Sequence, residues 1–250
     1  MAQSTSTLPR QVLVEATIAA PIDEVWRAVR EPQRIATWFG WDAPTLEEEI
    51  AFIFLDHAAA DEATHTIRFE EWQGIADGFE LTEEDTTTRL EILRYNAPPV
   101  DIETSYDGMV EGWISFAEQL RFSLEQHPSE ARRTIYVAGA AKAGSPPPSV
   151  ALGLAEVAES EDGSIFEAVL DTGDMLNGAV RRRTRYQTIL EVGEWGRGML
   201  IVTDMDITEK RPHGGGSLLL TTYGMAEREF ADLQRRWSEW WTSRYSSEQV

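Results

Sequence analysis

The chain opens with a strand pattern that runs directly into a helix pattern. From Val12 to Ile18, every second residue is apolar, which is the period of a half-buried strand. Pro21 then suits the first turn of a helix, where its missing N–H costs nothing. This helix has one apolar stripe, formed by Ile22, Val25, Trp26 and Val29. A second short helix is predicted from Pro32 to its stop at Gly40, so both helices have a face that must be buried.

Between residues 50 and 95 the pattern predicts strands. Residues 50–55 are apolar at every position, which indicates a strand covered on both faces. Alternating segments follow at residues 65–72, 75–81 and 90–95, with a polar turn at 83–88. Two or three hairpins of an antiparallel meander account for this region.

A long helix is predicted from Asp107 to Gln126. It ends before His127-Pro128, because the residue that precedes a proline disfavours helix. Its apolar stripe is continuous and consists of Met109, Trp113, Phe116, Leu120 and Leu124.

The order of these elements and three short motifs resemble a known superfamily. The motifs are Ala-Pro-Ile-Asp-Glu-Val-Trp at residues 20–26, Glu-Pro at 31–32 and Trp-Phe-Gly at 38–40. They resemble the START-like helix-grip (SRPBCC) superfamily, and most closely the bacterial relatives of the heat-shock-protein-90 ATPase activator. The resemblance covers residues 8–127. It implies an α+β fold in which a curved antiparallel sheet grips a long C-terminal helix, with an apolar cavity between them.

The second half of the chain repeats the ending of the first half. Residues 104–109 (Thr-Ser-Tyr-Asp-Gly-Met) reappear as residues 221–225 (Thr-Thr-Tyr-Gly-Met), and each copy opens an amphipathic helix. We therefore predict a START-like domain at 8–127 and a second, degenerate one at 131–250. The alternative is one enlarged domain with the proline-rich segment 144–149 as a surface loop.

The elements of the second half are predicted from the same signals. A strand is expected at 133–137, and a helix at 150–159 with Ser149 as its N-cap. Further strands are expected at 165–170, 183–192, 199–207 and 217–223, and Gly214-Gly215-Gly216 is expected to form a turn.

Composition limits the partners. The formal net charge of −21 would repel nucleic acid and anionic membranes, so neither is an expected partner. No run of about 18 apolar residues is present. The N-terminus has neither the basic region nor the apolar core of a secretory signal, so we expect a cytoplasmic protein. Without cysteine, disulfides and thiolate metal sites are excluded.

The candidate binding site is the space between the sheet and the long helix. Aromatic residues at strand or helix spacing usually fill a core, but together they favour a small apolar or amphipathic ligand. The candidate ligand-binding residues are Trp38, Phe39, Phe52, Phe54, Phe69, Trp72, Tyr95, Tyr106, Trp113 and Phe116.

Metal and cofactor sites are not predicted. The four histidines include no pair at helical spacing, and His57 beside Asp56 and Asp61 is interpreted as part of a solvated loop. Asp204 and Asp206 are interpreted as outward-facing residues beside a buried Met205. Residues 139–144 have the glycine spacing of a phosphate-binding loop, but Ser145 stands where its lysine is needed.

No catalytic residue is assigned. The chain lacks a GxSxG elbow and cysteine, so nucleophilic catalysis has no signature. Acid or base chemistry would have to come from His65, Arg68, Glu70 or Glu71, on a strand that would line the sheet. The basic cluster Arg181–Arg185 could bind an acidic partner, but a local balance of the acidic surface is the favoured interpretation.

Three functions remain open. The leading hypothesis is a binding protein for a small hydrophobic molecule. A co-chaperone-like protein-interaction module is the second, and a cyclase, aromatase or hydrolase that uses polar residues in the same cavity is the third. The sequence favours binding over catalysis.

Overall fold

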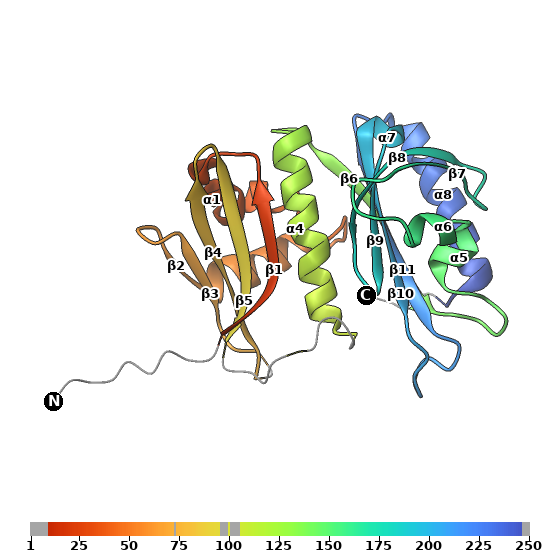
Figure 1. Ribbon diagram of the computed structural model, residues 1–250, viewed down its shortest axis with the longest axis horizontal. Coiled ribbons are helices and arrows are strands. Elements are labelled where there is room, and N and C mark those ends of the chain that lie inside the picture. Colours follow the sequence, from red (N-terminus) through yellow and green to blue (C-terminus); the bar gives the residue numbers. More distant parts are fainter. Residues whose placement is uncertain (1–9, 73, 96–99, 101–105, 247–250) are drawn as a thin grey trace. The chain divides into compact units, whose positions relative to one another are not determined.

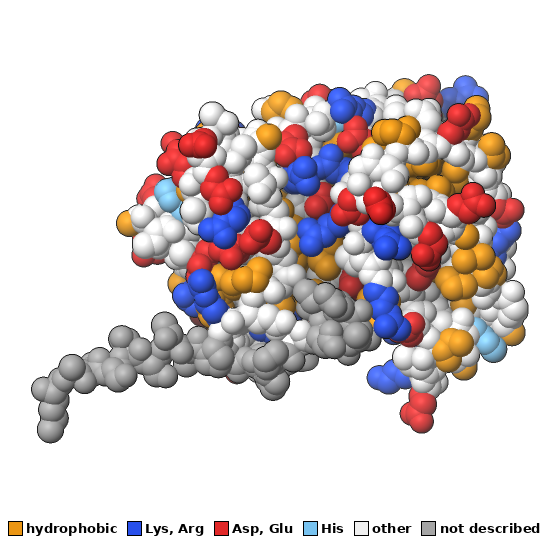
Figure 2. All heavy atoms as spheres, viewed as in Figure 1, with side chains coloured by type: hydrophobic (Ala, Val, Ile, Leu, Met, Phe, Trp, Pro, Cys, Tyr) orange, Lys and Arg blue, Asp and Glu red, His pale blue; other side chains and the backbone are white. Residues whose placement is uncertain are grey.

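The chain forms two compact units in a computed structural model that describes residues 10–72, 74–95, 100 and 106–246 (Figure 1). The units are Met1–Ser129 and Glu130–Val250. Figure 2 shows charged side chains of both signs over the face in view, with smaller hydrophobic patches between them. None of the described helices is long and apolar enough to cross a membrane.

The first unit is an antiparallel sheet followed by a long helix. Its strands are ordered β1-β5-β4-β3-β2, so the first strand pairs with the last. The elements are β1 (Arg10–Ile18), α1 (Ile22–Arg30), α2 (Pro32–Ile35), α3 (Leu46–Ile50), η1 (Ala51–Asp56), β2 (Ala58–Asp61), β3 (Thr66–Phe69), β4 (Ala76–Glu84), β5 (Thr87–Tyr95) and α4 (Gly108–Gln126).

The strand predicted at 12–18 is confirmed as β1, but its alternation is interrupted. The pairing of β1 with β5 shifts register between Val12 and Val14. Leu13 is thus an extra residue, as in a β-bulge, and the bulge turns it toward the core. Leu13 is 3% exposed, whereas Val12, which the pattern placed on the buried face, is 40% exposed.

The long helix is confirmed as α4. The Asp107 carboxylate caps it by accepting hydrogen bonds from the backbone N–H groups of Met109 and Val110, at 2.9 and 3.2 Å. Trp113 and Leu120 are buried as predicted. Met109 is 40% exposed, so the buried stripe begins at Val110 instead.

The strand predicted at 50–55 is wrong. These residues continue the helix α3 into η1, a π-helix. Ile50 and Phe54, four residues apart, are buried, whereas Phe52 and Leu55 are exposed. A short run of apolar residues does not distinguish a strand from a helix, and here the acidic turn at 47–49 begins a helix that the run extends.

The second unit has a similar connectivity with one more strand among the described residues. Its strands are ordered β6-β11-β10-β9-β8-β7, with the first strand again beside the last. The elements are β6 (Arg132–Ala140), α5 (Pro148–Leu152), α6 (Ala155–Ala158), β7 (Ile165–Val169), β8 (Met175–Arg183), β9 (Gln187–Val192), α7 (Glu194–Arg197), β10 (Gly198–Met205), β11 (Gly215–Tyr223) and α8 (Glu227–Arg244).

Four details of the second unit differ from the prediction. The single helix expected at 150–159 is two short helices, α5 and α6, because Gly153 adopts a φ of 85° between them. Ser149 lies inside α5 and is not its N-cap. The strand β8 was not predicted, and Gly215 and Gly216 belong to β11 rather than to a turn.

Each unit thus places one long helix after an antiparallel sheet. In the second unit, α8 contributes Phe230, Leu233 and Trp237 to a core shared with residues of β8 to β11. The predicted fold class, α+β with a helix-grip arrangement in tandem, is confirmed.

Candidate functional site

Seven aromatic rings meet between the sheet and α4 of the first unit. Phe39 lies 4.8 Å from Phe116 and 4.9 Å from Phe54, measured between ring centroids. Most pairs are edge-to-face, the arrangement that the ring quadrupole favours. We call this set the seven-ring cluster; it consists of Trp38, Phe39, Phe54, Phe69, Phe79, Trp113 and Phe116.

Five different segments supply these rings. Trp38 and Phe39 follow α2, and the indole N–H of Trp38 donates to the Ala28 carbonyl at 2.9 Å, which fixes the ring. Phe54 comes from η1, and α4 contributes Trp113 and Phe116 three residues apart on one helix face. The remaining two rings come from β3 and β4.

The cluster is buried at its centre and reaches the surface at two rings. Trp38, Phe54 and Phe79 are no more than 1% exposed. Phe69 and Phe116 are only partly buried. These two rings therefore lie at the edge of the cluster, where it meets solvent.

Phe69 and Trp113 form a pair with nearly parallel ring planes. Their centroids are 5.7 Å apart and their planes differ by 16°. Phe69 is partly exposed, whereas Trp113 is 8% exposed and hydrogen-bonded. One face of a buried, hydrogen-bonded indole is thus covered by a partly exposed ring.

Three of the predicted ligand-binding residues, Phe52, Trp72 and Tyr95, lie outside the cluster. Phe52 and Trp72 are exposed and contact each other instead. Tyr95 follows Arg94 on β5 and lies on the opposite sheet face, where the Arg68 guanidinium stacks on its ring at 4.1 Å. Tyr106 is partly buried, two residues before α4.

Phe79 belongs to the cluster but was not among the predicted site residues. It shares its parity on β4 with Asp77 and Leu81, and all three are buried. The sequence signal was therefore present, because residues of one parity line one sheet face.

A buried ion-pair network borders the cluster. The Asp77 carboxylate accepts two hydrogen bonds from the Arg94 guanidinium, at 2.9 and 3.1 Å, and one from the Trp113 indole N–H at 2.9 Å. Arg94 also donates to Asp107, the cap of α4, at 3.1 Å. The network therefore joins the strands β4 and β5 to the first turns of α4.

Electrostatics keeps Arg94 charged in this position. Burial alone would lower the pKa of the guanidinium, but hydrogen bonds and attraction to Asp77 and Asp107 outweigh burial and raise the pKa above its ordinary value. Both Asp77 oxygens already accept hydrogen bonds. The network is thus suited to holding Trp113 in place rather than to transferring a proton.

The polar residues considered for acid or base chemistry do not converge inside the unit. Glu70 and Glu71 are exposed, and Arg68 stacks on Tyr95. His65 is partly buried, with its ring edge-on to Trp26 at 5.3 Å. None of these four side chains contacts the seven-ring cluster among the ring and hydrogen-bond contacts of the described residues.

The candidate metal ligand His57 and the basic cluster Arg181–Arg185 make contacts within the protein itself. His57 Nδ1 lies 2.9 Å from the Phe52 carbonyl, and no group of three or more potential metal ligands exists among the described residues. In the basic cluster, Arg181 pairs with Glu191 at 3.2 Å and Arg183 with Glu159 at 3.5 Å. These ion pairs are those expected of a local charge balance.

The second unit has an open surface hollow of about 430 Å³. Its lining includes Ile165, Asn177, Ala179, Glu191 and Arg197. Glu191 and Arg197 already pair with each other at 2.8 Å. The hollow is open to solvent and its charges are balanced, so it is a weaker candidate than the seven-ring cluster.

Asp204 is partly buried rather than outward-facing, and it should make stability depend on pH. Its carboxylate accepts hydrogen bonds from the Ser149 N–H at 3.0 Å and the Ser149 hydroxyl at 2.5 Å. Burial raises the pKa of Asp204 more than these bonds lower it. The folded state therefore holds the proton more tightly than the unfolded state, and the resulting stability is lost as pH rises through the raised value.

We expect Asp204→Asn to remove this contribution. Urea unfolding at a series of pH values, from below about 4 upward, should show wild-type stability falling relative to the variant as pH increases. Parallel stability curves for the two proteins would contradict the assignment.

Comparisons with known proteins give only distant likenesses. No family model matches the chain, and no curated protein does, so the resemblance to the heat-shock-protein-90 ATPase activator stays a prediction. The chain is similar to the solved structure of DynU16, from the dynemicin biosynthetic locus, with 20% identity, a TM-score of 0.30 and coverage of 93% of this chain and 94% of that one.

Two further solved structures are di-domain ARO/CYC proteins. BexL, from the BE-7585A biosynthetic pathway, is 13% identical with a TM-score of 0.34, over 97% of this chain and 100% of that one. StfQ, from the steffimycin biosynthetic pathway, is 10% identical with a TM-score of 0.33, over 92% and 93%. At these TM-scores the fold assignment rests on this chain's own strands and helices.

Proposed function

We propose that the first unit binds a small, flat apolar molecule in the seven-ring cluster. The observation that carries the proposal is the near-parallel pair of Phe69 and Trp113, with centroids 5.7 Å apart. The ligand takes the place of the Phe69 ring on the face of Trp113, and Phe69 turns outward. The stacking of the ligand on Trp113 then replaces the stacking of Phe69 on Trp113, so the core stays filled.

The polar border of the cluster supports binding rather than catalysis. Asp77 is held by Arg94 and Trp113, and Asp107 is held by Arg94 and the start of α4. A general acid or base needs a group within hydrogen-bond reach of the substrate and free to exchange a proton. Asp77 instead fixes the orientation of the Trp113 indole, and Asp107 holds Arg94 and the first turn of α4.

The proposal is tested by measuring how the neutral fluorescent probe N-phenyl-1-naphthylamine binds to the wild type and to two variants at Phe69. We expect one saturable site in the wild type, with Phe69→Ala binding the probe roughly 2- to 10-fold more tightly, because a competing ring pair of about 0.5–1.5 kcal/mol is removed. The bulkier Phe69→Trp should bind it more weakly. Fluorescence titration gives the affinities, and native mass spectrometry gives the stoichiometry.

Equal affinities for all three proteins would overturn this assignment, as would a stoichiometry above one probe per chain that does not saturate. Circular dichroism of each variant confirms that folding is retained. Native mass spectrometry of the freshly purified chain can also detect a molecule that co-purifies.

A further inference from the structure

An exposed aromatic patch lies on the first unit, away from the seven-ring cluster. Phe52, Leu55 and Trp72 are 45%, 42% and 60% exposed. The rings of Phe52 and Trp72 meet edge-to-face at 6.2 Å, and the His57 ring lies 4.0 Å from Phe52. We call Phe52, Leu55, His57 and Trp72 the aromatic patch. Large apolar side chains grouped on a surface typically mark an interaction site.

The local backbone holds the patch outward. Phe52 and Leu55 belong to the π-helix η1, in which Phe54 faces the core. The His57 N–H donates to the Phe52 carbonyl at 3.1 Å, and the Glu70 N–H donates to the His57 carbonyl at 2.8 Å, which ties η1 to the segment before Trp72. π-Helices are rare and are frequent at functional sites.

Exposed acidic residues adjoin the members of the aromatic patch along the chain. Residues 35–67 contain seven acidic residues and no lysine or arginine. Glu48 lies one turn before Phe52, Asp56 follows Leu55, and Glu70 and Glu71 precede Trp72. All four carboxylates are exposed, and none forms an ion pair within the described part of the chain.

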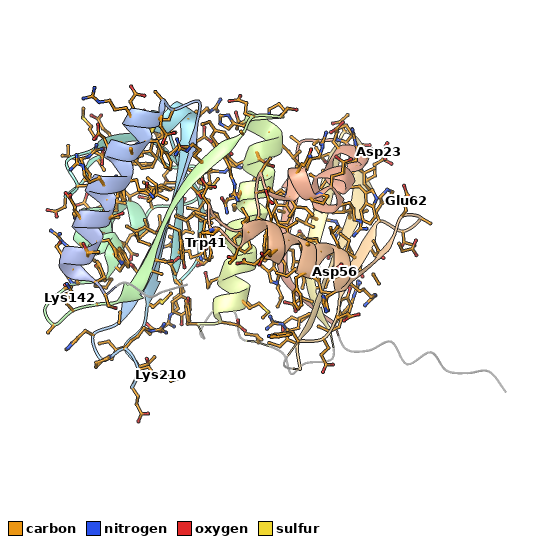
Figure 3. The ribbon with its side chains drawn as sticks, turned by 180° about the vertical axis from the view of Figure 1, so that it is seen from behind. Asp23, Trp41, Asp56, Glu62, Lys142 and Lys210 are labelled. Atoms are coloured by element: carbon orange, nitrogen blue, oxygen red, sulfur yellow. The ribbon has the colours of Figure 1, made fainter. Side chains whose placement is uncertain are left out.

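Figure 3 shows Asp56 near the end of the helical segment formed by α3 and η1, and Glu62 at the turn of the β2–β3 hairpin. Of the nearby cations, Arg30 donates to the Phe54 carbonyl at 3.2 Å and Arg68 stacks on Tyr95. The negative charge around the patch is therefore available to a partner.

We propose that the aromatic patch docks a cationic, apolar segment of a partner protein. Lysine or arginine side chains of that segment pair with the adjoining carboxylates and lie over the Trp72 ring, which attracts cations through its π face. Its apolar side chains cover Phe52 and Leu55. A second copy of this chain is a poor occupant, since each copy carries a net charge of −21.

The test uses two short synthetic peptides and isothermal titration calorimetry. One peptide alternates arginine with leucine, and the other alternates arginine with serine, so they share charge and differ in apolar content. We expect the arginine–leucine peptide to bind roughly tenfold more tightly, and the double variant Phe52→Ser/Trp72→Ser to lose this difference. Added salt should weaken both peptides.

A matched control separates the patch from general attraction to an acidic protein. Ile207→Ser/Val169→Ser removes two apolar side chains of the second unit that are 73% and 72% exposed, and it should bind both peptides as the wild type does. The proposal is overturned if the patch variant and the control variant bind alike, if the wild type binds neither peptide, or if the wild type is a dimer that Phe52→Ser/Trp72→Ser dissociates.

Discussion

Replacing Asp77 with alanine is expected to destabilise the first unit by about 3–5 kcal/mol, because it leaves a buried arginine without its main partner. Arg94 is 3% exposed and Asp77 is 5% exposed. The variant also leaves the Trp113 indole N–H without its acceptor, which adds to the cost. Urea unfolding, together with hydrogen exchange of the β4 and β5 amides, measures the loss in this unit.

The double variant Asp77→Leu/Arg94→Met removes both charges but keeps most of the side-chain volume. It therefore distinguishes the effect of an unpaired charge from the effect of a cavity. Replacing both charges by apolar side chains of similar size is often close to neutral. We therefore expect the double variant to be clearly more stable than Asp77→Ala, and to keep the cap that Asp107 gives to α4. A double variant as unstable as the single one, or an Asp77→Ala variant within about 1 kcal/mol of wild type, would contradict this account of the network.

The fold could be predicted from sequence because its strongest signals are local. The alternation before Pro21, the two proline-started helices and the long stripe of α4 each occupy adjacent residues. The repeated ending before α8 then indicated a second unit with a similar connectivity. Periodicity over many residues is the most reliable part of such a prediction.

The misassigned segments have short or mixed signals. Residues 50–55 are apolar throughout, so periodicity could not separate a strand from the π-helix η1. The strand β8 includes Asn177 and Gly178, which are poor strand formers, and its pairing with β9 supplies what its own sequence lacks. The bulge at Leu13 likewise depends on pairing with β5.

The candidate site could be predicted only in part, since membership depends on which sheet face a residue occupies. Phe69 and Trp113, both predicted for the sheet–helix space, contact each other in the seven-ring cluster, and their role in binding stays a prediction. Tyr95 was assigned to the same space, but it lies on the opposite face from Phe79. The contact of Arg94 with Asp77 joins residues 17 apart in sequence, and no local sequence pattern predicts it.

The two units show that a similar strand order can be stabilised by different residues. In the first unit, an aspartate of β4 accepts the indole N–H of Trp113. In the second unit, the indole N–H of Trp237 on α8 donates to Asp174, which lies in the turn between β7 and β8. Each long helix thus has a tryptophan bonded to a carboxylate, although the Trp-Phe-Gly motif of the first unit is absent from the second.

Trp237→Ala is accordingly expected to destabilise the second unit by about 3–5 kcal/mol, the cost typical of removing a large buried ring. Trp237 is fully buried and lies edge-on to Trp195 at 5.6 Å. Trp237→Phe, which keeps a ring but loses the hydrogen bond to Asp174, should cost much less. Thermal unfolding followed by circular dichroism, with hydrogen exchange of β9 and β10, measures both. If Trp237→Phe were as destabilising as Trp237→Ala, the hydrogen bond rather than ring packing would hold α8 on its sheet.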